Sequence, residues 1–224
     1  ARDIPRDAAR ALASYQQACG KTSSVGCAPL GHALLRRGDP VSKRAAVRAF
    51  ESACRANDDG ACVELAGLLL KGKAVARNTK RAARLLHTAC GRKEMKACHF
   101  LGQMYRQGDR TGRDPARADA YYHRACVAGF LPSCSARARM LLVGDGVAPA
   151  GEKARALLRK TCGKKVWSDC VYLAQHLASA TGQGEQALQL LTRTCTAGHK
   201  LSCILQAQLS LEQGQGDVQV AIDL

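Results

Sequence analysis

The spacing of the cysteines constrains this chain more than any other feature. Its twelve cysteines fall into six pairs, with seven residues between the members of every pair. From the second pair to the fifth, the same pattern returns every 36 residues. A period of this length is typical of arrays in which each unit packs only against its neighbours, so the chain is expected to grow by stacking. The pairs are Cys19/Cys27, Cys54/Cys62, Cys90/Cys98, Cys126/Cys134, Cys162/Cys170 and Cys195/Cys203.

Each unit is predicted to be a pair of helices. In the clearest unit, from Lys96 to Cys134, apolar residues recur at helical spacing in two stretches separated by a loop. No stretch approaches the roughly eighteen apolar residues that a membrane span requires. We therefore expect one all-α array over residues 1–224. Its predicted parts are a capping helix at 1–19, repeats at 20–54, 55–90, 91–126, 127–162 and 163–195, and an incomplete repeat at 196–224.

Two rows of small residues repeat together with the cysteines. The residue eight positions before the first cysteine of a pair is always alanine, and the residue four positions after the second is always glycine or alanine. Helices approach closely only where side chains are small, so both rows are predicted to mark the crossing within each helix pair. The first row is Ala11, Ala46, Ala82, Ala118, Ala154 and Ala187, and the second is Gly31, Ala66, Gly102, Ala138, Ala174 and Ala207.

Cysteine counts alone leave the pairing open, but the repeated spacing favours a disulfide within each pair. If the first cysteine ends one helix and the second begins the next, a short turn brings their Cα atoms to ~5–6 Å, which suits a disulfide. Six such bonds imply an oxidising compartment. The alternative is a cytosolic array in which reduced cysteines are buried as small hydrophobic residues. Zinc binding and a redox-active dithiol are disfavoured, because the sequence has no Cys-x-x-Cys and no Cys/His cluster.

The same unit carries a family resemblance. The Sel1-like repeat, a relative of the tetratricopeptide repeat, is similar to the stretch Leu101-Gly102-Gln-Met104-Tyr105-Arg-Gln-Gly108, followed by Ala118 and Ala125. The Gly-x-Gly-Val loop of that repeat is similar to Val143-Gly144-Asp-Gly146-Val147. The paired cysteines resemble those of the secreted cysteine-rich Sel1-like proteins of Helicobacter. The resemblance implies an α/α solenoid of disulfide-stapled helix pairs that winds into a right-handed superhelix.

The resemblance also indicates where a partner would bind. In tetratricopeptide-like arrays the first helix of each pair lines the concave face. The equivalent positions in this chain are one, five, eight and nine residues after the second cysteine of a pair. Several residues at these positions are polar or cationic, at intervals that a core would not tolerate. The alternative is that they form only the solvated stripe of each helix. The candidate contacts are His32, Arg36, Lys71, His99, Gln103, Arg106, Arg139 and Gln175, together with Lys96 two residues before its cysteine.

A net charge of +16 favours an acidic partner. The expected partner is a protein or peptide, and an anionic cell-envelope polymer is the alternative. Nucleic acid is disfavoured by the oxidising compartment and by the lack of any recognised binding motif. A basic coat that serves solubility alone also accounts for the charge.

Signals for catalysis are weak. The sequence lacks the Ser-x-x-Lys, Gly-x-Ser-x-Gly, His-Glu-x-x-His and phosphate-loop patterns, and nothing in it calls for a metal or cofactor. We therefore expect a non-catalytic scaffold that is secreted or periplasmic. Two alternatives come from the resemblance. One is a cell-wall or beta-lactam-binding protein with weak hydrolase activity, and the other is an assembly factor of the mitochondrial intermembrane space.

Overall fold

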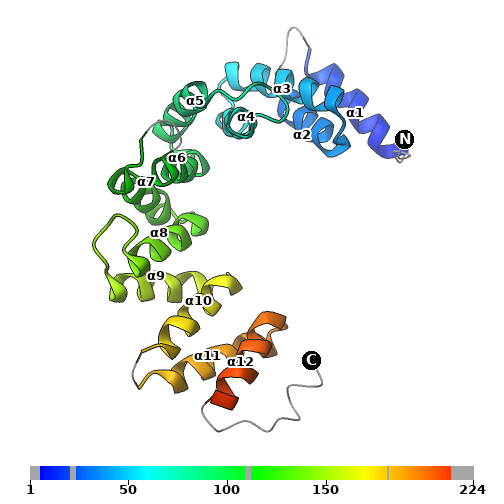
Figure 1. Cartoon of the computed structure of the whole chain (residues 1–224). Coiled ribbons are helices and arrows are strands. Elements are labelled where there is room, and N and C mark those ends of the chain that lie inside the picture. Colours follow the sequence, from blue (N-terminus) through cyan, green and yellow to red (C-terminus); the bar gives the residue numbers. More distant parts are fainter. Residues whose placement is uncertain (1–5, 21–23, 109–111, 181, 213–224) are drawn as a thin grey trace. The chain divides into compact units, whose positions relative to one another are not determined.

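In the computed structural model the chain is built from helices joined by short turns (Figure 1). The structure describes residues 6–20, 24–108, 112–180 and 182–212, and contains no strand within these ranges. None of the helices there is long and apolar enough to cross a membrane. The predicted incomplete repeat at 196–224 lies outside the described residues from position 213 onward.

The chain divides into two compact units, Ala1–Ala128 and Gly129–Leu224, which we describe separately. The finer division into a capping helix, five repeats and an incomplete repeat, the single array and the right-handed winding stay predictions. Unit 1 contains α1 (Arg6–Ala18), α2 (Cys27–Arg37), α3 (Pro40–Arg55), α4 (Asp59–Lys71), α5 (Thr79–Gly91), α6 (Met95–Gln107) and α7 (Pro115–Val127). Unit 2 contains α8 (Leu131–Val143), α9 (Gly151–Gly163), α10 (Trp167–Ala178), α11 (Gly184–Thr196) and α12 (Lys200–Glu212).

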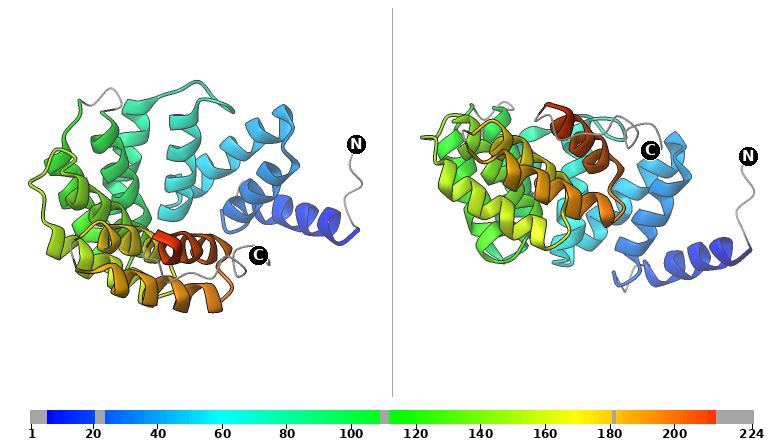
Figure 2. Two further views of the ribbon diagram at one scale, coloured as in Figure 1. Left: turned by 60° about the horizontal axis from the view of Figure 1, so that its bottom comes forward. Right: turned by 90° about the horizontal axis from the view of Figure 1, so that it is seen from below.

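Helices pack in pairs, and within each unit each pair packs on the next. We call α2, α4, α6, α8, α10 and α12 the first helices, and α1, α3, α5, α7, α9 and α11 the second helices. A hairpin joins a first helix to the second helix that follows it, as in α4/α5 and α6/α7 of unit 1 and α10/α11 of unit 2. Second helices also contact the next first helix, as in α3/α4 and α5/α6 (Figure 2). Successive first helices touch as well, α4 with α6 and α10 with α12. This connectivity is the predicted solenoid pattern.

The two rows of small residues lie inside the hairpins. Alanines of both rows are completely buried from Ala46 to Ala187. A Cβ atom added to Gly31 would lie 2.7 Å from the ring of Phe50, and one added to Gly102 would lie 2.6 Å from the ring of Tyr122. In the hairpins that have alanine instead of these glycines, leucine stands at the ring position: Leu86, Leu158 and Leu191. The crossing therefore has two forms, glycine under an aromatic ring and alanine under leucine.

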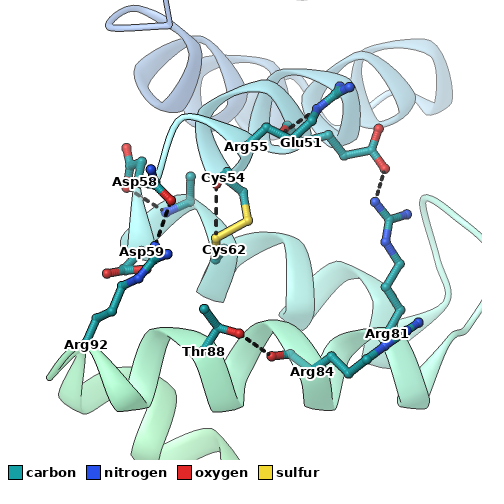
Figure 3. Close-up of a disulfide and its surroundings, with 12 residues drawn as sticks. Glu51, Cys54, Arg55, Asp58, Asp59, Cys62, Arg81, Arg84, Thr88 and Arg92 are labelled. Atoms are coloured by element: carbon teal, nitrogen blue, oxygen red, sulfur yellow. Dashed lines mark hydrogen bonds and ion pairs between the residues drawn. A yellow bond between two sulfur atoms is a disulfide. The ribbon is translucent and has the colours of Figure 1, made fainter.

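Within each unit, disulfides join a second helix to the first helix of the next pair, as the spacing predicted. Figure 3 shows one of them, Cys54–Cys62, between α3 and α4. In the bonds Cys19–Cys27, Cys54–Cys62, Cys90–Cys98, Cys162–Cys170 and Cys195–Cys203 the Cα atoms lie 4.5 to 4.9 Å apart, slightly closer than expected. Cys126 and Cys134 are also disulfide-bonded, and none of the described cysteines is free.

The turn that each disulfide spans needs a left-handed residue. Three positions after the first cysteine of a pair, φ is positive in every turn that the structure describes completely. Glycine adopts this conformation without a steric penalty, asparagine tolerates it, and lysine does so at a cost. The residues are Asn57 (65°), Lys93 (70°), Gly129 (91°), Lys165 (63°) and Gly198 (88°).

Candidate functional site

All predicted contact residues lie on first helices, divided between the two units. His32 and Arg36 are on α2, Lys71 on α4, and Lys96, His99, Gln103 and Arg106 on α6, all in unit 1; Arg139 is on α8 and Gln175 on α10, in unit 2. His32, Arg36, Lys71 and Gln175 are exposed, and the other five are half-buried.

Lys96 is held by a neighbouring first helix. Its Nζ atom lies 2.6 Å from Oε1 of Glu64, so the ion pair links α6 to α4. Much of the charge of Lys96 is compensated within the fold, and the residue is less suited to attract a partner than the sequence indicated.

Arg139 is held even more firmly. Its Nη2 atom donates to Oδ1 of Asp169 at 3.1 Å, and its guanidinium lies over the ring of Tyr172, 4.4 Å from the centroid. The Asp169 side chain has no exposed area and also accepts a hydrogen bond from the Ser135 hydroxyl. A buried carboxylate needs such partners. Arg139 is therefore part of a polar cluster that joins α8 to α10.

Sequence reasoning did not identify Asp169. The residue stands one position before the second cysteine of its pair, where the other repeats have small residues. That contrast is a signal that could have identified it. The small residues are Gly26, Ala61, Ala97, Ser133 and Ser202.

His99 and Gln103 form a pair on α6. Nε2 of Gln103 lies 3.0 Å from Nε2 of His99. Burial lowers the pKa of His99 to about 4, so its ring is neutral at pH 7 and accepts this hydrogen bond from the amide. The same ring packs 5.4 Å from the ring of Tyr122. His99 is thus a packing residue of the α6/α7 hairpin.

A hollow between two first helices brings two of the predicted residues together. It has a volume of about 320 Å³ and is open to solvent. Lys71 and Gln103 line it, and no carboxylate does. The lining residues are Gly67, Leu70 and Lys71 of α4, Arg77 of the following loop, and Phe100, Gln103, Met104 and Gln107 of α6.

An aromatic cluster that sequence reasoning missed ties α5, α6 and α7 together. Tyr105 and Tyr121 stack with ring centroids 5.6 Å apart, and Arg117 lies over Tyr105 at 5.5 Å. Nε2 of His87 is 3.3 Å from the Tyr105 hydroxyl, and Nδ1 is 3.2 Å from that of Tyr121. Desolvation and the charge of Arg117 lower the pKa of His87. Because both ring nitrogens already have partners, we assign the cluster a structural role.

The carboxylates that the structure describes in unit 1 are used within the fold. Four of them accept a backbone N–H at a helix N-terminus: Asp39, Asp58, Glu94 and Asp114. Three others form ion pairs with cations of the next repeat: Glu51 with Arg81, Asp59 with Arg92, and Glu64 with Lys96 (Figure 3 shows the first two). Lys and Arg outnumber Asp and Glu by 34 to 18, so the charge left facing solvent is mainly positive.

The described residues contain no group of three or more His, Cys, Asp or Glu side chains that could hold a metal ion. Around Asp169, both carboxylate oxygens have partners, while the buried Nε of Arg139 has none among the described residues; around His87, both ring nitrogens have partners. The Ser135 hydroxyl does donate to the Asp169 carboxylate, but both side chains are buried.

Comparison with known proteins identifies the repeat. The Sel1 repeat family model matches residues 60–92, 96–130 and 132–164. These three segments are therefore similar to the Sel1 repeat. Proteins with Sel1 repeats generally mediate protein–protein interaction, and the six disulfides suggest an oxidising compartment. No curated protein matches this sequence significantly.

Solved structures with Sel1-type folds cover nearly the whole chain. A protective antigen of uropathogenic Escherichia coli is 21% identical and matches 98% of this chain with a TM-score of 0.79; the chain spans 49% of that protein. A Sel1 repeat protein from Oxalobacter formigenes is 17% identical over 96% of this chain and 92% of its own length, with a TM-score of 0.78. The cysteine-rich protein B of Helicobacter pylori is 23% identical over 59% of this chain and 96% of its own, but its TM-score of 0.46 supports no argument. At these identities the first two matches show the fold alone.

Proposed function

We propose that this protein is a non-catalytic scaffold that binds an acidic protein or peptide through the face of its first helices, outside the cytosol in a secreted or periplasmic setting. One observation carries the proposal. Carboxylates of unit 1 are used as helix caps and in contacts between repeats, while Lys71 and Arg77 line an open hollow that no carboxylate lines. Proteins with Sel1 repeats are in general non-enzymatic scaffolds.

The mechanism is shape combined with charge. Disulfides and inter-repeat ion pairs hold the first helices in place before a partner arrives, so binding orders few additional groups. The excess positive charge raises the rate of encounter with an acidic partner. The affinity should therefore fall as salt is added.

Selection from a phage-displayed random peptide library on the oxidised full chain tests the proposal. We expect the enriched peptides to be rich in Asp and Glu, and their binding to weaken as NaCl rises from 50 to about 500 mM, because salt screens exposed charges. Enrichment without acidic bias would contradict the proposal. Binding of purified lipopolysaccharide in place of any peptide would favour the envelope-polymer alternative.

The location has its own test. Titration of the denatured, unreduced native protein with a thiol reagent should detect no free sulfhydryl, because all twelve cysteines are in disulfides. A full set of free thiols would place the protein in a reducing compartment.

A further inference from the structure

The hollow between α4 and α6 is lined by one glycine, Gly67. Gly67 lies five positions after the second cysteine of its pair, where every other repeat carries a larger polar side chain. A Cβ atom added to Gly67 would meet nothing within 4 Å, so the space above it is open. Those larger residues are His32, Gln103, Arg139, Gln175 and Gln208.

A glycine in the middle of a helix destabilises the helix, since it increases the freedom of the unfolded chain. Gly67 makes no close contact that would require glycine, in contrast to Gly31 and Gly102, which lie under aromatic rings. Packing therefore does not explain Gly67. What the structure does show at Gly67 is the hollow itself.

The hollow combines an apolar floor with a polar rim. Leu70 and Phe100 are half-buried side chains that line it, and Met104, which is 4% exposed, lies deeper. A partner that covers these half-exposed apolar side chains removes apolar surface from water, which stabilises the complex. Methionine adapts its shape to what it contacts. The volume of about 320 Å³ lies at the small end for ligand pockets, which suits one side chain rather than a large cofactor.

The rim is cationic and can bind peptide groups. Lys71 is exposed and forms no ion pair with any residue that the structure describes. Arg77, in the loop after α4, also lines the hollow. The amide nitrogen of Gln103 is used by His99, which leaves its carbonyl oxygen to accept a hydrogen bond from a peptide N–H.

We propose that this hollow is an anchor site for one apolar side chain, of the size of leucine or phenylalanine, in a peptide segment whose neighbouring residues are acidic. The apolar side chain covers Leu70, Phe100 and Met104, and the flanking carboxylates bind Lys71 and Arg77. The inference depends on the proposed function and specifies the partner: an acidic segment interrupted by an apolar residue.

The test is to fill the hollow without harming the helix. Gly67→Gln introduces the residue found at the same position in α6 and α10, and should preserve or raise the melting temperature. The matched control is Gly91→Gln on α5, because Gly91 also lies in a helix and also has nothing within 4 Å of an added Cβ atom. The probes are fluorescein-labelled synthetic versions of the library-selected acidic peptides, and versions with glycine in place of the apolar residue.

Fluorescence anisotropy should show a loss of at least tenfold in affinity when the apolar residue becomes glycine. Gly67→Gln should produce a similar loss for the parent peptide and no further loss for the glycine peptide, because both changes remove the same contact. The affinity of Gly91→Gln for the parent peptide should stay within twofold of that of the unaltered chain. Equal binding of the parent peptide by Gly67→Gln and the unaltered chain overturns the inference, while acidic binding and the proposed function stand.

A second variant keeps the inference testable if Gly67→Gln fails to fold. Lys71→Gln changes an exposed side chain. It should lower the affinity for the acidic peptides several-fold, but should not lower the affinity for a peptide in which Gln replaces Glu. Equal weakening of both peptides overturns the assignment of Lys71 to the carboxylate. Failure to select any acidic peptide on the unaltered chain refutes the proposed function, and the anchor site with it.

Discussion

Two hairpins of unit 1, α4/α5 and α6/α7, perform the same structural task with different residues. In α4/α5 the crossing is formed by Ala66 and Leu86, and in α6/α7 by Gly102 and Tyr122. A smaller residue on one helix thus accompanies a larger one on the other, so the total volume at the crossing is kept approximately constant. The repeat therefore fixes the total side-chain volume at the two crossing positions, and not the identity of the residue at each position.

The difference extends to other equivalent positions. Val63 on α4 corresponds to His99 on α6, and Gly67 corresponds to Gln103. Asn57 in the turn before α4 corresponds to Lys93 in the turn before α6. The disulfide that precedes each first helix is what the two hairpins share. Exchanging residues between them separates the shared features from the particular ones, and we order the resulting predictions by the size of the expected effect.

Removal of a disulfide should have the largest effect and should be equal at the two sites. Both Cys54–Cys62 and Cys90–Cys98 close a loop with a sequence separation of 8. The chain-entropy model gives a loss of about 2 to 3 kcal/mol for a loop of this size. We expect Cys54→Ala with Cys62→Ala, and Cys90→Ala with Cys98→Ala, to shift the urea midpoint to the same extent. Markedly unequal shifts would mean that the two turns are not equivalent.

Gly102→Ala should destabilise the protein by about 2 kcal/mol, because the new methyl group would overlap the Tyr122 ring. Tyr122→Leu in the same chain should restore most of this loss by converting the crossing to the form seen in α4/α5. Urea unfolding of the four chains of this double-mutant cycle measures the coupling. Gly67→Ala is the matched control, because its added Cβ atom meets nothing, and it should stabilise by about 0.5 to 1 kcal/mol. Additive effects of Gly102→Ala and Tyr122→Leu would refute the shared-volume interpretation.

His99 should make stability depend on pH. Its pKa is about 4 in the folded protein and near 6.5 when unfolded, so between these values the unfolded chain binds a proton that the folded chain does not. Stability should therefore fall as the pH is lowered from 6.5 to 4, by about 1 kcal/mol, since the ring is only partly buried. His99→Val, which introduces the residue of α4, should remove this part of the dependence in unfolding curves at the two pH values. An unchanged dependence in His99→Val would assign it to another group.

Lys93→Asn should have the smallest effect. Lys93 has a φ of 70° in its turn, and Asn57 occupies the same position with a φ of 65°. Asparagine tolerates this left-handed conformation better than lysine does, so we expect a gain of about 0.5 kcal/mol. A small rise in melting temperature, measured by circular dichroism, would agree with this expectation. Lys93→Gly should give a somewhat larger rise, and a decrease in both variants would show that the Lys93 side chain has a stabilising contact.

The candidate site was only partly predictable. Lys71 and Gln103 were identified because polar residues stood at positions equivalent to the groove of related arrays. Gly67 and Arg77 were missed, since a glycine offers no chemistry of its own and a loop residue has no place in the helical pattern. Lys96 and Arg139 were expected to face a partner. In the structure each binds a carboxylate on another first helix, Glu64 and Asp169 respectively.

The sequence by itself determined the helix pairs, the disulfide pairing and the small residues at the crossings. These features depend on separations of a few residues along the chain, and periodicity and cysteine spacing record them directly. Only the tertiary structure decided which cations are compensated, that His87 bridges two tyrosines, and that the space above Gly67 stays open. Those outcomes depend on how consecutive repeats stack, and side chains that are about 30 to 35 positions apart meet there without leaving a pattern that one sequence can show.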